Sequence, residues 1–113
     1  MPAKPNIPAA EALELTALIS YTEQGISSRV IAQSGVGNVT LFAFDEGQEL
    51  SEHASPFEAL VEVLEGTLMV TVGGTRARAA AGTVVRIPSN EPHALESPGR
   101  AKMMLVMLRG RGN

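Results

Sequence analysis

The clearest alternation of apolar and polar residues along the chain lies between residues 58 and 65. One face of this predicted strand is apolar, and we expect it to be buried; its residues are Ala59, Val61 and Val63. Glutamates occupy the other face, where Leu60 and Leu64 join them. Because apolar residues that cluster on a solvated face are unfavourable, we expect another strand or a second subunit to cover part of this face.

Further short apolar segments, separated by turn residues, predict an antiparallel sandwich or barrel. The predicted strands are 28–34, 39–45, 67–72, 75–79, 83–88, 93–96 and 101–108, with a polar loop at 47–57. Gly73 and Gly74 favour a two-residue hairpin, since glycine accepts the positive φ of such a turn. Asn90, in a turn between two prolines, tolerates a left-handed backbone. Residues 11–21 fit either a short helix or a strand, and we favour a strand after a brief turn.

The length of 113 residues predicts one domain, because two cores would each be too small to bury enough apolar surface. Pro2, Pro5 and Pro8 disfavour helix, so residues 1–12 are expected to form a flexible N-terminal arm. Residues 13–113 then form the single domain.

Composition excludes several classes of function. The net charge of -3 gives no basic surface for nucleic acid or an anionic membrane. There is no cysteine, which rules out disulfides, thiolate nucleophiles and zinc–thiolate sites. The sequence shows neither a membrane span of about 18 apolar residues nor the apolar core of a secretion signal, and we therefore expect a cytoplasmic protein.

The two histidines of the chain occupy matching places in two similar units. In the first unit Gly47 is followed after five residues by His53, and the next strand ends at Gly66. In the second, a strand from Gly82 leads to a proline turn and then to His93. This pairing is the strongest functional signal in the sequence.

The two units resemble the two motifs of the cupin superfamily, in small single-domain proteins of the RmlC-like type. The first family motif reads Gly, five residues, His, one residue, His, three or four residues, Glu, six residues, Gly; the second reads Gly, five residues, Pro, one residue, Gly, two residues, His, three residues, Asn. The positions that match are Gly47, His53, Gly66, Gly82, Pro88 and His93. The resemblance covers about residues 36–108 and implies an antiparallel double-stranded β-helix, or jelly-roll barrel, with a pocket between its two sheets.

The departures from the motifs bear on function. Metal-binding cupins use both motif-one histidines, the glutamate and the motif-two histidine. In this chain Ser55 stands at the second histidine and Ala59 at the glutamate, while Asn90 and Ser97 replace the motif-two Gly and Asn. The resemblance thus implies a degenerate metal site that retains only His53 and His93.

We expect both histidine rings to point into one cavity whose lining includes Ser55, Ala59, Val61 and Val63. The candidate third ligand is Glu58, if a bulge after Pro56 turns it inward, with Glu52 and Gln48 as weaker candidates. Phe57, Met103, Met104 and Met107 are apolar candidates for the lining, although methionines at these spacings are more often plain core.

Three functions follow from this site. The first is a small-molecule-binding module, with or without a divalent metal (Zn, Ni, Mn or Fe). The alternatives are a metal-dependent enzyme and a metal-free enzyme with a histidine as general base, of the oxygenase or isomerase type, acting on a small metabolite. A general base usually needs a carboxylate or tyrosine partner, and Tyr21 lies far from both motifs in sequence. The apolar residues on both strand faces also predict a homodimer.

Overall fold

The computed structural model describes residues 6–109, which contain nine strands and one short 3₁₀ helix. The helix η1 (Leu15–Leu18) precedes all the strands. The strands are β1 (Ile26–Ser34), β2 (Gly37–Phe44), β3 (Glu49–His53), β4 (Glu58–Glu65), β5 (Thr67–Val72), β6 (Thr75–Ala80), β7 (Val84–Ile87), β8 (His93–Glu96) and β9 (Ala101–Leu108). Among these residues, no helix is long and apolar enough to cross a membrane.

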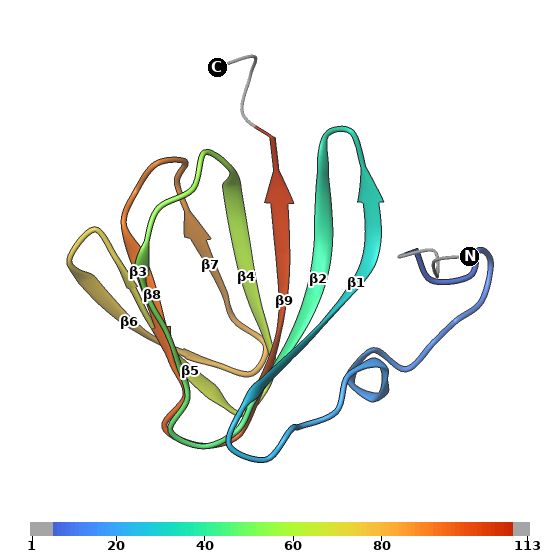
Figure 1. The fold of residues 1–113 in the computed structure, drawn as a ribbon, viewed down its shortest axis with the longest axis horizontal. Helices are drawn as coiled ribbons and strands as arrows, with labels where there is room; N and C mark the ends of the chain where they lie inside the picture. The colour runs from blue at the N-terminus through green and yellow to red at the C-terminus, as the bar shows by residue number, and fades with distance from the viewer. Residues whose placement is uncertain (1–5, 110–113) are drawn as a thin grey trace.

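The strands form two antiparallel sheets that face each other (Figure 1). The larger sheet has the strand order β1-β2-β9-β4-β7, and the smaller has the order β3-β8-β5-β6. Strands distant in sequence are therefore neighbours; β9, for instance, lies between β2 and β4. This arrangement confirms the predicted all-β jelly-roll fold.

The main core fills the space between the two sheets. Val61 and Val63 of β4 are buried, at 0% and 1% exposed, and so is Ala59, as the alternation in this strand predicts. From the smaller sheet, Leu68 and Val70 pack against them. Burying one such side chain stabilises the fold by about 1.5–3 kcal/mol, so this core accounts for much of the stability of the domain.

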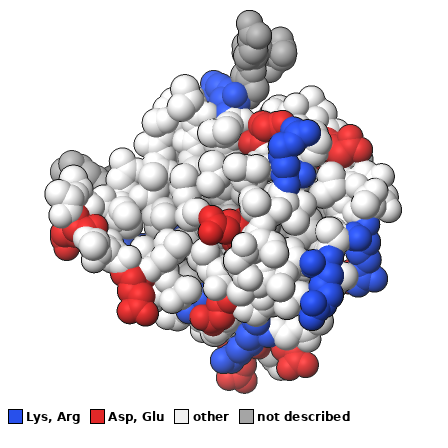
Figure 2. All heavy atoms as spheres, turned by 180° about the vertical axis from the view of Figure 1, so that it is seen from behind, with Lys and Arg blue, Asp and Glu red and all other residues white. Residues whose placement is uncertain are grey.

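A second apolar cluster lies on the outer face of the larger sheet, beneath the N-terminal segment. Ile19 is buried there against Leu41 and Ala43 of β2, and Leu64 packs at the edge of the cluster. Leu64 is thus covered by other residues of the same chain. Seen from behind Figure 1, charged side chains stand mostly near the rim, and a broad area without them surrounds one acidic group (Figure 2).

The preference for a strand within residues 11–21 is wrong. Residues 15–18 form η1, in which the backbone N–H of Ala17 donates to the carbonyl of Glu14, three residues earlier. This segment lies on the outer sheet face and attaches by side-chain packing, so a strand partner is not needed. Of the predicted arm, residues 1–5 lie outside the described residues, whereas the N–H of Ile7 donates to the carbonyl of Ile31 in β1.

The polar loop predicted at 47–57 contains a strand, β3. Its sequence, ELSEH, has one apolar residue, Leu50, and hence almost no strand signal. Pairing with β8 holds it in place, with Leu50 opposite Leu95. A strand that is defined by its partner rather than by burial leaves little trace in the sequence.

Glycine is required at the two turns that border β5. Gly73 and Gly74 have φ of 56° and 92° and make the predicted hairpin between β5 and β6. Gly66 has φ of 75°, and a Cβ there would collide with the carbonyl oxygen of Arg100. Asn90 has the predicted left-handed backbone, with φ of 65°.

Candidate functional site

The structure brings the two histidines together as a cross-strand pair. His53 ends β3 and His93 begins β8, and their Cα atoms are partners in the β3–β8 register. Their ring centroids are 4.3 Å apart and the ring planes meet at 61°, edge to face. Two positions 40 residues apart in the chain, 53 and 93, thereby supply one site.

Both rings are oriented by the same kind of hydrogen bond. Nδ1 of His53 lies 2.9 Å from the carbonyl oxygen of Ser51, and Nδ1 of His93 lies 2.9 Å from that of Glu91. A carbonyl oxygen only accepts, so Nδ1 must carry the proton in each ring. In the neutral rings both Nε2 atoms therefore present a lone pair, which is the arrangement found in histidines that bind metals or accept a hydrogen bond.

The histidines border a cavity of about 80 Å³ between the sheets. His53 is exposed and stands at its mouth, whereas His93 is buried at 8% exposure and forms part of the wall. The complete lining is Leu50, His53, Ser55, Ala59, Val61, Ile87, His93, Leu95, Met103, Leu105 and Met107. None of these residues is Asp, Glu, Lys or Arg, so the cavity is apolar apart from the two rings and the Ser55 hydroxyl.

Three of the four predicted lining residues, Ser55, Ala59 and Val61, border the cavity. Val63 is not among the lining residues and packs in the main core. Two of the predicted methionines, Met103 and Met107, contribute to the lining. The third, Met104, packs in the outer cluster, as expected for neighbours that alternate along a strand.

Glu58 does not join the histidines. Its carboxylate pairs with Arg86 and accepts the backbone N–H of Ser89 at 3.3 Å. The register of β4 with β9 is unshifted from Glu58 to Val63, so no bulge in this stretch turns Glu58 inward. Glu52 is exposed, and Gln48 lines a separate groove beside Ser97.

The residues present do not fit a metal centre held by three or four protein ligands. Within residues 6–109, no group of three or more His, Cys, Asp or Glu side chains is placed to hold a metal ion. Two imidazoles alone are one ligand short of the usual catalytic zinc site. The site therefore offers two imidazole nitrogens as ligands.

The tyrosine is not near the histidines either. Tyr21 lies in the outer cluster, where its hydroxyl donates to Glu65. Burial raises the pKa of Tyr21 above its usual range, and the hydrogen bond to Glu65 adds to the effect. Tyr21 therefore stabilises the N-terminal segment and does not partner a histidine base.

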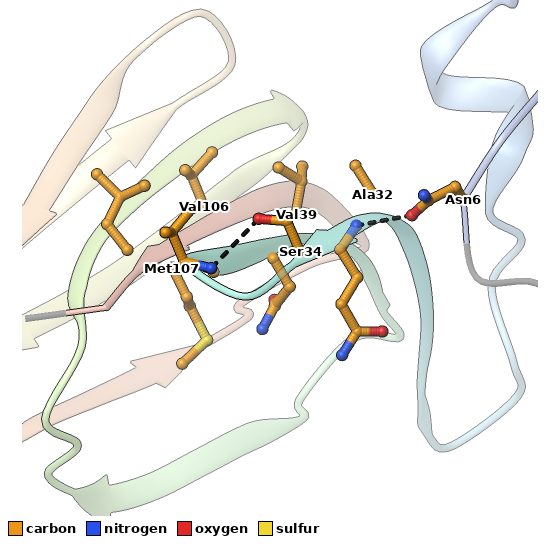
Figure 3. A pocket seen from close by; sticks show the side chains of 11 residues that line it. Asn6, Ala32, Ser34, Val39, Val106 and Met107 are labelled. Atoms are coloured by element: carbon orange, nitrogen blue, oxygen red, sulfur yellow. Dashed lines mark hydrogen bonds between the residues drawn. The ribbon is translucent and has the colours of Figure 1, made fainter. Parts of the chain in front are cut away.

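A larger surface groove, of about 240 Å³, lies beside the end of β1, the start of β2 and the end of β9, and it shares Met107 with the histidine cavity (Figure 3). It contains neither histidine and is lined by residues such as Asn6, Ala32, Val39 and Val106. The Oδ1 atom of Asn6 already accepts the N–H of Gln33 at 2.7 Å. The groove offers open apolar surface, and its lining includes no His, Asp, Glu, Lys or Arg.

Several lining residues were missed by reasoning from sequence: Leu50, Ile87, Leu95 and Leu105. Leu95 could have been found, because a residue two positions after His93 points to the same side of a strand. Ser97 was also missed as a structural residue. It is 2% exposed, and its hydroxyl lies 2.7 Å from the carbonyl of Asp45 and 3.1 Å from that of Gln48, which ties the loop before β3 to the end of β8.

The chain belongs to the cupin family, because the family model described as "Cupin domain" matches residues 40–109. It is similar to a conserved protein of unknown function from Streptococcus pyogenes, with 32% identity over 94% of this chain and 93% of that one, and a TM-score of 0.87. A cupin superfamily protein from Desulfitobacterium hafniense has 28% identity, coverage of 93% and 96%, and a TM-score of 0.86. A Cupin 2 conserved barrel domain protein from Leptotrichia buccalis has 30% identity over 86% of this chain and 47% of that one, with a TM-score of 0.82. No curated protein matches the chain.

Proposed function

We propose that this cupin binds a small molecule in the cavity, with the apolar part of the ligand between the sheets and its polar end on the histidines. The observation that carries the proposal is the pair of Nε2 lone pairs beside an otherwise apolar cavity. Apolar walls with a few convergent polar groups are the usual composition of a ligand site. The absence of a third ligand or a carboxylate partner within residues 6–109 favours binding over catalysis.

The test is an NMR titration of the isotopically labelled protein with four-carbon probes that differ only in their polar end: 1-butanol, butyrate and methyl propyl ether. Binding of any probe should shift the backbone amides of Val61, Leu95 and Met103, which surround the cavity. The proposal is wrong if none of the probes shifts these amides at concentrations up to about 100 mM. A dissociation constant of that size corresponds to a binding free energy of little more than 1 kcal/mol.

A divalent metal is the second candidate, favoured by the two lone pairs in one cavity. Zn, Ni, Mn or Fe would receive two imidazole ligands from the protein, and a bound molecule or water would supply the others. Calorimetric titration of untagged, EDTA-treated protein with each divalent ion distinguishes the candidates. Stoichiometric binding that is lost in both His53→Ala and His93→Ala favours the metal, and no binding to the unmodified protein excludes it.

A further inference from the structure

We infer that the ligand is a neutral molecule with two adjacent hydrogen-bond donors, such as a vicinal diol, on a short apolar chain. This inference rests on the proposed function and adds to it the chemistry of the ligand. Three properties of the cavity carry it: the hydrogen-bonding roles of its polar atoms, its lack of charge and its size.

The polar atoms of the cavity are mainly acceptors. Because Nδ1 of each ring donates to a backbone carbonyl, the Nε2 atoms of His53 and His93 both accept. Ser55 supplies the one hydroxyl in the lining that can donate. A ligand group that only accepts, such as an ether or a carboxylate, therefore finds one donor and faces two lone pairs. A group that donates is matched by both histidines.

The lining also discriminates against charge. In the neutral form of its two histidines, the lining holds no cation to pair with an anion, and it includes no Asp or Glu to pair with a cation. The nearby charges Arg86 and Glu58 neutralise each other outside the cavity. Moving an ion from water into such a site without a partner is costly, whereas a hydroxyl that forms hydrogen bonds is not. A neutral ligand is thus preferred to an acid or an amine of the same size.

The number of donors follows from the pairing of the histidines. Their ring centroids are 4.3 Å apart, so the two acceptors belong to rings that are in contact. Donors on adjacent carbon atoms can serve both, while a single hydroxyl has one proton and satisfies only one. His53 is exposed, so the polar end of the ligand can remain at the mouth while the chain enters the cavity.

The size of the cavity limits the apolar part. Its volume of about 80 Å³ is roughly half of the ~150 Å³ of an engineered cavity that binds benzene. A chain of about four carbon atoms is consistent with this space. Met103 and Met107 in the walls are flexible side chains that adapt to small differences in shape.

The experiment compares dissociation constants measured by NMR for 1,2-butanediol, 1-butanol, methyl propyl ether and butyrate, with EDTA present throughout. We expect the diol to bind about fivefold more tightly than 1-butanol, and 1-butanol about fivefold more tightly than the ether or butyrate, since a neutral hydrogen bond contributes about that factor. If butyrate or the ether binds as tightly as the diol, the inference is wrong although the proposed function stands. Equal affinities of the diol and 1-butanol refute the assignment of two donors. No binding of any probe refutes the proposed function itself.

Two variants link the selectivity to the histidines. His53→Phe keeps a ring at the exposed mouth but removes one acceptor. The diol and 1-butanol should therefore bind this variant with about equal dissociation constants. Arg78→Gln, at an exposed position on β6, is the matched control and should keep the fivefold ratio. Retention of the ratio in His53→Phe would overturn the inference, and the amide spectrum of each variant verifies that the fold is unchanged.

Discussion

His53 lies directly opposite His93 in the β3–β8 pair, with 4.3 Å between the ring centroids. The site therefore depends on strand register as well as on residue type. A slip of one residue in either strand would move one ring to the opposite face of the sheet. Leu50 lies opposite Leu95 in the same pair, and a shift of the β3–β8 register between Leu50 and His53 lets both residues line the cavity although they are three positions apart.

The first prediction concerns the tautomers of the two histidines. We expect the neutral form of both rings to carry the proton on Nδ1, because Nδ1 faces the carbonyl of Ser51 in one ring and that of Glu91 in the other. Long-range proton–nitrogen correlation spectra distinguish the two ring nitrogens. A ring with the proton on Nε2 would contradict the geometry and remove one of the two acceptors from the cavity.

The second prediction compares how much each histidine contributes to the stability of the fold. His53→Ala should change the thermal midpoint by no more than a few degrees, because the side chain is exposed and the core is aliphatic. His93→Ala removes a buried ring and leaves the carbonyl of Glu91 without its partner, which should cost about 2 kcal/mol and lower the midpoint by several degrees. Differential scanning calorimetry measures both. A larger loss in His53→Ala than in His93→Ala would contradict their placement.

Much of the fold could be predicted because burial and backbone conformation leave clear signals in the sequence. The alternation at Ala59, Val61 and Val63 identifies a strand with one buried face, and Gly73–Gly74 identifies the hairpin that follows. The pairing of the two histidines was likewise expected from the resemblance of two segments to the family motifs. For the strand and the hairpin the signal lies within a few consecutive residues, and for the histidines it lies in two short motifs.

The parts that could not be predicted depend on neighbours that are distant in sequence. β3 is a strand because β8 lies beside it, and η1 takes its place through packing on the outer sheet face. Glu58 points away from the cavity, as strand alternation predicts, but only the unshifted register from Glu58 to Val63 excludes the bulge that could have turned it inward. The tautomers follow from hydrogen bonds whose geometry is set only in the folded chain.

The third prediction concerns acid stability. Asp45 accepts the backbone N–H of Gln24 at 2.6 Å and the Nε–H of Arg100 at 2.9 Å. The hydrogen bond from Gln24, followed by that from Arg100, lowers the pKa of Asp45 to about 2, from 3.8. A carboxyl whose pKa is lower in the folded state stabilises the fold above its unfolded pKa, and this contribution is lost as the pH falls toward the folded pKa.

The measurement is urea unfolding of the unmodified protein and of Asp45→Asn between pH 2 and pH 6. The unmodified protein should be the more stable of the two at pH 5–6, and the difference should shrink as the pH falls from about 4 to about 2. The comparison removes the effect of the other carboxyl groups, which both proteins share. A difference that stays constant over this range would show that Asp45 has an ordinary pKa.

The fourth prediction concerns the attachment of the N-terminal segment to the larger sheet. The hydroxyl of Tyr21 donates to Glu65, and Arg100 and Lys102 lie 4.9 and 5.0 Å from its ring centroid. Tyr21→Phe keeps the ring but removes the hydrogen bond, and we expect a loss of about 1–1.5 kcal/mol in the free energy of unfolding. Urea denaturation measures the loss, with Ser20→Ala at a neighbouring exposed position as control. Equal stability of the two variants would exclude a stabilising role for the hydroxyl.

The last prediction is the homodimer. The N-terminal segment covers only part of the outer face of the larger sheet. On the same face, Leu60 of β4, Val84 of β7 and Leu108 of β9 remain 36%, 60% and 47% exposed. Because β4 lies between the other two strands, these side chains share one face, on which Glu62 and the Glu58–Arg86 ion pair lie among them. We expect a second copy of the chain to bury it in a two-fold symmetric interface, in which the same surface meets itself.

Light scattering coupled to size exclusion at micromolar concentration should give about twice the chain mass of 11.9 kDa. Leu60→Lys or Val84→Lys places a charge in each half of the apolar interface and should shift the protein to the monomer mass. Thr75→Lys is the matched control, since Thr75 is exposed at the start of β6, in the smaller sheet and not on this surface. A monomeric unmodified protein, or dimers that persist in both lysine variants, would refute the proposed interface. Because the histidine cavity lies between the sheets and the interface lies on the outer face, the monomeric variants should still bind the probes that occupy the cavity.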